Sequence, residues 1–252
     1  MENRSCINCQ HRYAGNFCPQ CGQSSHEGRI NAHYFLHDIP HSVFHIDKGF
    51  FYTLKCLFTR PGYMIEEYLE GKRVKHFRPF AYVIIMSAIC TFLIKGIEWL
   101  THKIIMANAP DAVIPVHENF FAHYFSVFIF IMIPFASLVT WLTFYKKKYN
   151  YWEHFLANTY IAAQLNLILV LIRLVGLFVV LFTQKQDTNI DFKWFLMVFM
   201  MGFLFMYGNV FGVLMRGKYK IAKIIFILTL MNSILAIVYL LGFSLTGLVK
   251  FM

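Results

Sequence analysis

Hydrophobic residues gather into long runs over the last two-thirds of the chain, from residue 80 to residue 249, and short polar turns separate the runs. A helix needs about 20 consecutive, mostly apolar residues to cross a bilayer. The runs meet that length, so we expect them to be membrane-spanning helices. Five spans are predicted, at residues 80–100, 122–145, 155–182, 192–215 and 221–249. The third span exceeds the bilayer thickness and is expected to tilt or break.

The distribution of positive charge supports this number of crossings. Residues 1–79 contain ten lysines or arginines, and the turns 146–148 and 216–220 contain three each. The loops 101–121 and 183–191 contain one base each. Lysine and arginine are enriched in the cytoplasmic loops of membrane proteins. The alternation therefore predicts a cytoplasmic N-terminus, five crossings and a C-terminus on the outer side.

Composition favours the same class of protein. Hydrophobic residues make up 58% of the chain and charged residues 14%, whereas soluble domains carry about 25% charge. The start of the sequence lacks the apolar core and cleavage site of a secretory signal, so the first span is expected to direct insertion. Tryptophan prefers the membrane interface, and all four tryptophans fall at predicted span ends. They are Trp99, Trp141, Trp152 and Trp194.

Four cysteines lie in the first 30 residues, as two Cys-x-x-Cys pairs separated by eight residues. Two such turns can place four thiolates at the corners of a tetrahedron around one Zn²⁺. About 30 residues cannot bury a core, so the metal would supply the folding free energy, about 10–16 kcal/mol in small zinc peptides. A redox dithiol and disulfides are the alternatives. The predicted structural zinc ligands are Cys6, Cys9, Cys18 and Cys21, and Gly22 is expected to adopt a positive φ.

The segment 31–79 carries two further patterns. Histidines recur every four residues at His33, His37, His41 and His45, a spacing that allows neighbours on a helix to share a metal. The other interpretation is an amphipathic helix in the membrane interface, because apolar residues flank the histidines and Pro40 interrupts them. A short helix is predicted at residues 62–70, with Pro61 at its start and Gly71 at its end.

A group of bases directly before the first span can attract anionic headgroups, or it can serve only as a topogenic flank. The predicted ligands of an anion in this group are Arg60, Lys72, Arg73, Lys75 and Arg78. A separate candidate is Arg173, which lies inside the third span on the same helical face as Asn166. An arginine at that depth usually faces the bundle or a cavity, although it can also extend to the outer headgroups. Cys56 and Cys90 are expected to be packing residues.

Several of these motifs occur together in a known family. The four cysteines in the pattern CxxC…CPxCGQ, the string DKGFFxTL and the string RPGxxIxEYLxGKR before the spans resemble a bacterial integral-membrane family classed as a domain of unknown function. The resemblance implies a zinc knuckle and a location in the bacterial cytoplasmic membrane. It implies no activity.

The sequence therefore predicts an all-α membrane protein with a zinc ribbon at 1–30, a cytoplasmic interfacial helical segment at 31–79 and a five-helix transmembrane domain at 80–252. We expect a non-enzymatic module that docks a protein partner or anionic lipid. The alternatives are a lipid or anion transporter that uses Arg173, and a metalloenzyme that uses the histidines. Nucleic-acid binding is disfavoured because the ribbon contributes only Arg4, Arg12 and Arg29 as bases. The sequence contains no catalytic motif such as HExxH or GxSxG.

Overall fold

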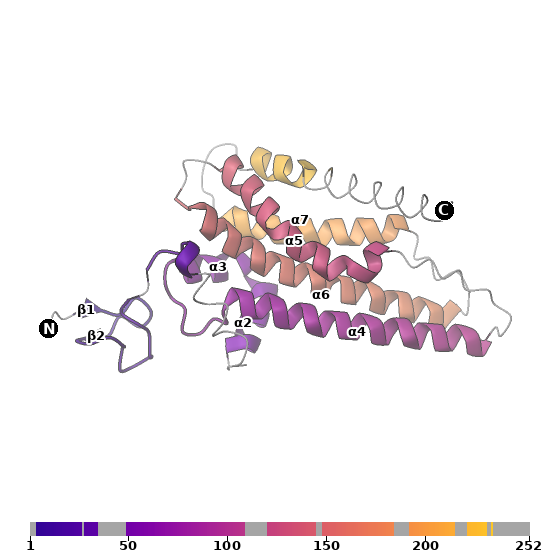
Figure 1. Ribbon diagram of the computed structural model, residues 1–252, viewed down its shortest axis with the longest axis horizontal. Helices are drawn as coiled ribbons and strands as arrows, with labels where there is room; N and C mark the ends of the chain where they lie inside the picture. Colours follow the sequence, from indigo (N-terminus) through magenta and orange to yellow (C-terminus); the bar gives the residue numbers. More distant parts are fainter. Residues whose placement is uncertain are drawn as a thin grey trace.

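The computed structural model is mostly helical, with a small two-stranded ribbon at its N-terminal end (Figure 1). It describes residues 4–26, 28–34, 49–108, 120–144, 148–183, 192–214, 221–230 and 233. The strands are β1 (Arg4–Ser5) and β2 (Arg12–Tyr13), which pair antiparallel. The helices are α2 (Gly49–Thr59), α3 (Pro61–Leu69), α4 (Pro79–Asn108), α5 (Phe120–Thr143), α6 (Tyr151–Thr183) and α7 (Phe192–Leu214).

The four long helices lie side by side along the long axis of the molecule (Figure 1). α4 and α6 begin at the end that carries the ribbon, and α5 and α7 return to it. Two helical stretches, Pro79–Asn108 and Tyr151–Phe182, are long and apolar enough to cross a membrane. α5 and α7 contain 24 and 23 residues. The fifth predicted span is helical over 221–230, and the rest of it lies almost entirely outside the described residues.

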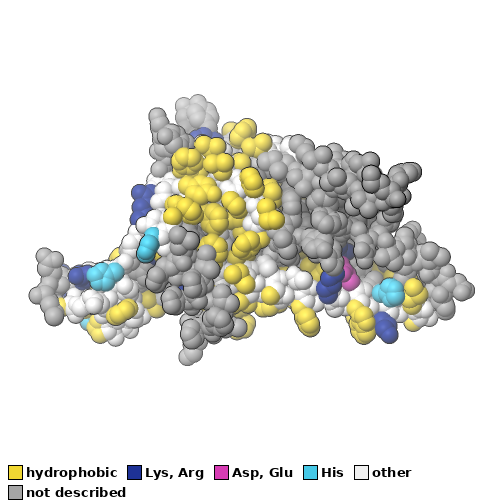
Figure 2. All heavy atoms as spheres, viewed as in Figure 1, with side chains coloured by type: hydrophobic (Ala, Val, Ile, Leu, Met, Phe, Trp, Pro, Cys, Tyr) yellow, Lys and Arg dark blue, Asp and Glu magenta, His cyan; other side chains and the backbone are white. Residues whose placement is uncertain are grey.

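The surface of this helical body carries many large apolar side chains. Figure 2 shows one broad hydrophobic area over its middle. Phe92 is 79% exposed on α4, Phe135 is 57% exposed on α5, and Phe182 is 84% exposed on α6. Soluble monomers rarely expose contiguous apolar patches beyond a few hundred Å². The exposed face of the bundle is thus suited to contact with lipid.

α3 is the short helix that the sequence predicts, and both of its ends follow from local chemistry. Pro61 occupies the first turn, where its missing N–H costs no hydrogen bond. At the other end Gly71 has φ +94°, its N–H donates to the carbonyl of Tyr68 (3.1 Å), and the N–H of Lys72 donates to the carbonyl of Glu67 (3.0 Å). This pair of bonds is the Schellman arrangement, which a glycine in the left-handed region allows.

Gly62 lets α3 press against α7. A Cβ atom at this position would stand 2.7 Å from Cγ2 of Val213 and well inside 3.0 Å of the carbonyl oxygen of Asn209, which is closer than real Cβ atoms come. Met64, Ile65 and Tyr68 of α3 are fully buried. The proline and glycine of the Arg-Pro-Gly string therefore start a helix and seat it on the bundle.

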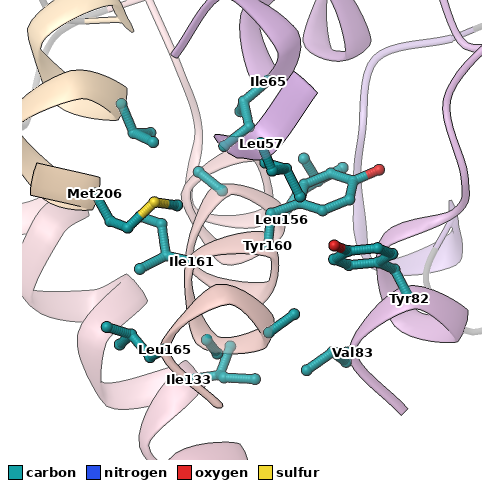
Figure 3. Packing of buried hydrophobic residues seen from close by; sticks show 14 of the residues in the cluster. Leu57, Ile65, Tyr82, Val83, Ile133, Leu156, Tyr160, Ile161, Leu165 and Met206 are labelled. Carbon is teal, nitrogen blue, oxygen red and sulfur yellow. The ribbon is translucent and has the colours of Figure 1, made fainter. Parts of the chain in front are cut away.

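Residues 49–79 share one hydrophobic core with the long helices. Figure 3 shows Leu57 of α2 and Ile65 of α3 among buried side chains of α4, α6 and α7, including Tyr82, Tyr160 and Met206. α2 was not predicted from the sequence. In the described residues the boundary at residue 79 therefore does not separate two packing units, because α2 and α3 form part of the core of the helical body.

A polar network lies inside the bundle, between α5, α6 and α7. Nδ1 of the buried His154 lies 3.1 Å from the hydroxyl of Thr140, the amide of Asn158 donates to the same hydroxyl at 3.1 Å, and the hydroxyl of Tyr207 donates to Asn158 Oδ1 at 2.6 Å. The His154 ring also stacks on Phe144 and Phe211. Buried polar groups with several partners fix the register of neighbouring helices.

Candidate metal centre and basic segment

The ribbon consists of two turns with the same internal hydrogen bonds. In the first, the N–H of Gln10 donates to the carbonyl of Cys6 at 2.9 Å; in the second, the N–H of Gly22 donates to the carbonyl of Cys18 at 2.8 Å. Gln10 and Gly22 follow the second cysteine of each pair and have φ of 62° and 76°. The positive φ predicted for Gly22 is confirmed. Among the described residues Gln10 is the one non-glycine residue with positive φ, a conformation that costs an ordinary residue about 1–2 kcal/mol.

The two turns bring the four predicted cysteines together. Their sulfur atoms all lie within 4.8 Å of one another, and the pairs Cys6–Cys21 and Cys9–Cys18 are 3.5 Å apart. Tetrahedral coordination with metal–sulfur bonds of about 2.3 Å separates the sulfurs by roughly 3.8 Å. None of the four forms a disulfide. The cluster therefore fits a single metal ion, and its four protein ligands would leave no open coordination position.

The thiols differ in how readily they ionise. Burial disfavours the thiolate of Cys21, but hydrogen bonds from the backbone of Gln23 and from Asn8, together with contacts to neighbouring thiols, lower its pKa to about 6. For Cys9 a backbone hydrogen bond at His11 lowers the pKa, but burial and hydrogen bonds with the other thiols raise it to about 12. Adjacent thiolates repel one another, so a divalent cation is what would allow all four sulfurs to ligate as thiolates.

One contact ties the second turn of the ribbon to the helical body. Gln23 is 1% exposed, and its Oε1 accepts a hydrogen bond from the backbone N–H of Arg73 at 3.2 Å. Its own carbonyl accepts from the N–H of Cys18 at 2.9 Å. Gln23 therefore bonds to Cys18 of the cysteine cluster through its backbone and to the basic segment, residues 71–78, through its side chain.

The chain after the ribbon is held by the N-terminus of α6. Asn150 Oδ1 accepts from the N–H of Glu153 at 2.9 Å, and the Glu153 carboxylate accepts from the N–H of Asn150 at 2.6 Å, a reciprocal capping box. The same carboxylate binds Arg29 through two N–H groups at 2.9 and 3.0 Å. The amide of Asn150 also donates to the carbonyl of Ile30, whose side chain is fully buried in the main core.

The structure assigns different surroundings to the predicted anion ligands. Arg60 forms an ion pair with Glu67 at 3.6 Å, and Lys72 forms one with Glu70 at 3.3 Å. Arg73 is only 9% exposed; its guanidinium donates to the carbonyls of Tyr68 and Gly28 and stacks on two tyrosine rings. The prediction that Arg73 binds a headgroup is therefore wrong, because its side chain is buried. Its side chain serves as an internal brace, because carbonyls and aromatic faces replace its hydration.

Lys75 and Arg78 are exposed directly before α4. Arg173 lies at the other end of the bundle, because Glu98, its partner at 3.8 Å, is 20 positions along α4 from Arg78. At 1.5 Å per residue that separation is about 30 Å, the thickness of the hydrocarbon layer. The predicted ligands therefore do not form one site. Arg173 belongs to a seam in which α6 bonds to α4, together with Gln164–Tyr82 and Asn166–Ser87, both 2.9 Å.

α2 places an aromatic stripe beside the basic segment. Phe51 is 70% exposed and Phe58 is 45% exposed, with the exposed Lys55 between them on the same face. The opposite face is anchored, because the hydroxyl of Thr53 accepts from the N–H of Phe77 at 2.7 Å. This stripe was not predicted from the sequence. The signal available there was the spacing of Phe51, Lys55 and Phe58, which places the three residues on one helical face.

Two further predictions concern other candidate ligands. Of the histidine stripe, only His33 lies within the described residues; His37, His41 and His45 lie outside them. Cys56 is 5% exposed and Cys90 is fully buried, both in the main core, as predicted for packing residues.

Comparison with known proteins gives one match. No curated protein and no solved structure matches the chain. The family match starts after the four cysteines and covers α2, α3, the basic segment and the first part of α4. Residues 47–91 match a family described as a protein of unknown function (DUF3667).

Proposed function

We propose that this chain is a non-enzymatic, multi-pass protein of the bacterial cytoplasmic membrane, and that its ribbon end binds anionic lipid headgroups. Five spans, a cytoplasmic N-terminus and an outer C-terminus are part of the proposal. It is supported by the two long apolar helices, by the alternation of bases along the chain, and by the resemblance noted above. The reducing cytoplasm would keep the ribbon cysteines as thiols.

We infer that the metal in the four-cysteine centre is zinc and that it is structural. Four cysteines at tetrahedral spacing suit zinc, and such a site keeps no position for a substrate or water. The need for a metal follows from the ribbon's size. In its described part, the buried apolar cluster contains only Cys6, Tyr13 and Cys18, with Cys9 and Cys21 packed against it.

The observation that carries the lipid proposal is the surface formed by α2 and the segment after α3. Phe51 and Phe58 project from α2 beside Lys55, while Lys75 and Arg78 are exposed where α4 begins. We call these five residues the interfacial surface. Aromatic rings enter the headgroup region, and lysine or arginine near the membrane surface contributes about 1 kcal/mol each toward anionic lipid. α2 packs against the segment that leads into the first span, because the hydroxyl of Thr53 accepts a hydrogen bond from the N–H of Phe77.

Native mass spectrometry of the detergent-purified full chain tests the proposal, with equal amounts of phosphatidylglycerol and phosphatidylcholine added. We expect the wild-type chain to retain phosphatidylglycerol preferentially. A Lys75→Gln, Arg78→Gln double variant should lower that preference by up to roughly 30-fold, the equivalent of two bases. Lys103→Gln, at the far end of α4, is the matched control and should leave it unchanged.

A double variant that keeps its metal and the full lipid preference would refute the proposal. In that case the bases would serve only to orient the first span, or would bind a protein partner. A transport function through Arg173 is not favoured by its contacts, because the guanidinium already faces the carboxylate of Glu98.

A further inference from the structure

The four-cysteine centre and the basic segment 71–78 are joined through one side chain, and this connection suggests what the metal controls. The two regions lie 50 positions apart in sequence at their point of contact, Gln23 to Arg73. We propose that metal binding in the ribbon braces the basic segment through Gln23, so that the segment is held in place when the centre is loaded and loosened when the metal is lost.

The fold of the ribbon depends on its metal. The apolar cluster of the described ribbon is separate from the main core and consists of one tyrosine and cysteine side chains. Such a small cluster cannot hold the two turns once the sulfurs lose their common ion. The position of Gln23 depends on the second turn, because its carbonyl is bonded to the N–H of Cys18.

The buried side chain of Gln23 is incompletely hydrogen-bonded. Its Oε1 accepts from the N–H of Arg73, but its Nε2 is buried and has no hydrogen-bond partner among the described residues. A buried amide that lacks a partner would gain hydrogen bonds by moving into water. Gln23 therefore stays buried because the folded ribbon keeps it there. When the ribbon unfolds, the Gln23 side chain is expected to move into water, and its hydrogen bond with the backbone N–H of Arg73 is lost.

The chain that follows the ribbon is anchored on the helical body by other contacts. Ile30 is fully buried in the main core, and Arg29 is bound to Glu153, so residues 29–30 are anchored on the helical body independently of the cysteines. Among the described residues, the hydrogen bond between Gln23 and Arg73 is therefore the contact that we expect to depend on the metal. Within the basic segment the N–H of Arg73 also contacts the carbonyl of Gly71, and the N–H of His76 donates to the carbonyl of Arg73 at 3.0 Å.

Hydrogen–deuterium exchange of the full chain in detergent, followed by mass spectrometry, tests the proposal without any lipid ligand. The reporter is the peptide that covers residues 72–77. We expect a zinc chelator to speed deuterium uptake in this peptide by about tenfold, the effect of losing roughly one buried hydrogen bond. Added Zn²⁺ should restore slow uptake. Peptides from α6 beyond its first turn should not change.

Two variants make the outcome decisive. Gln23→Ala keeps all four cysteines, so it should retain one metal per chain and yet show fast uptake at 72–77, with little further change on chelation. Ser24→Ala is the control, because its hydroxyl contacts the N–H of His26 within the ribbon, and it should behave as wild type. Unchanged uptake at 72–77 in metal-free wild-type protein would overturn the proposal. An undiminished effect of the chelator in Gln23→Ala would also overturn it.

Discussion

Replacing Gly62 by alanine tests whether the seat of α3 on α7 limits stability. The new methyl group would overlap the carbonyl oxygen of Asn209 and stand 2.7 and 2.8 Å from two carbons of Val213. The carbonyl belongs to helical backbone and cannot rotate away, so α3 and α7 must separate. Overpacking of this kind costs about 1–3 kcal/mol.

Alanine also carries a gain, because glycine inside a helix is about 0.5–1 kcal/mol less favourable than alanine. The net expectation for Gly62→Ala is a loss of about 1–2 kcal/mol in the free energy of unfolding. Gly96→Ala in α4 and Gly208→Ala in α7 are the controls. Beyond the backbone of its own helix, a Cβ atom at either position meets no atom of the described residues within 4 Å, so both variants should be as stable as the wild type or slightly more stable.

The assay is thermal or denaturant unfolding of the detergent-solubilised chain, with all variants in the same detergent. A further variant identifies the source of the strain. Val213→Ala in the Gly62→Ala background removes the overlap with Cγ2 but keeps Cβ of residue 213 and the carbonyl of Asn209, so it should restore only part of the loss. Gly62→Ala with wild-type stability, or complete rescue by Val213→Ala, would show that the contact with the backbone carbonyl of Asn209 does not limit stability.

Three other predictions concern the ribbon and its surroundings. Gln10→Gly should stabilise the metal-loaded ribbon by about 0.5–1 kcal/mol, measured as slower metal transfer to a chelator, because glycine accepts the positive φ that Gln10 adopts. Burial lowers the pKa of His76 against the opposing effect of Glu67, so the unfolded chain binds the proton more readily. The contribution of neutral His76 to stability should be fully present above about pH 6.5 and should decline below it. His76→Gln should therefore show a smaller fall in melting temperature between about pH 8 and pH 5.5. Glu153→Gln should cost about 1 kcal/mol of stability by breaking the ion pair with the mostly exposed Arg29, and an equally stable variant would argue against this anchor.

Features set by neighbouring residues were predictable from sequence. The Cys-x-x-Cys spacing predicted the cluster because each pair lies within one turn. Pro61 and Gly71 predicted α3 because helix ends depend on the φ that each residue permits. An Asn-x-x-Glu capping signal at Asn150 was also available and was missed.

Features set by contacts between distant segments were not predictable. Arg73 reads as a surface base within a Gly-Lys-Arg string, but it is buried because Gln23, 50 positions earlier, and the carbonyl of Gly28 surround it. α2 was missed because its outward stripe is aromatic, which hides the usual contrast between an apolar and a polar face. Gly208 lies in a Gly-x-x-x-Gly spacing that is typical of close helix packing, but a Cβ there meets no atom of the described residues within 4 Å. Gly62 and Gly202 make tighter contacts.

In the proposed membrane location, the length of α4 has a consequence for the thickness of bilayer that the helix can cross. Thirty residues rise about 45 Å, whereas the oily layer of a typical bilayer is about 30 Å thick. If Arg78 stays at one membrane interface, the last ten residues of the helix extend beyond the opposite interface. Alternatively, the helix tilts steeply, which keeps them inside the hydrocarbon layer. Trp99 begins that excess, and Thr101, His102 and Lys103 follow it. The tilt of α4 should therefore follow the thickness of the bilayer. Lipids of graded acyl-chain length should change this tilt before they change the fold.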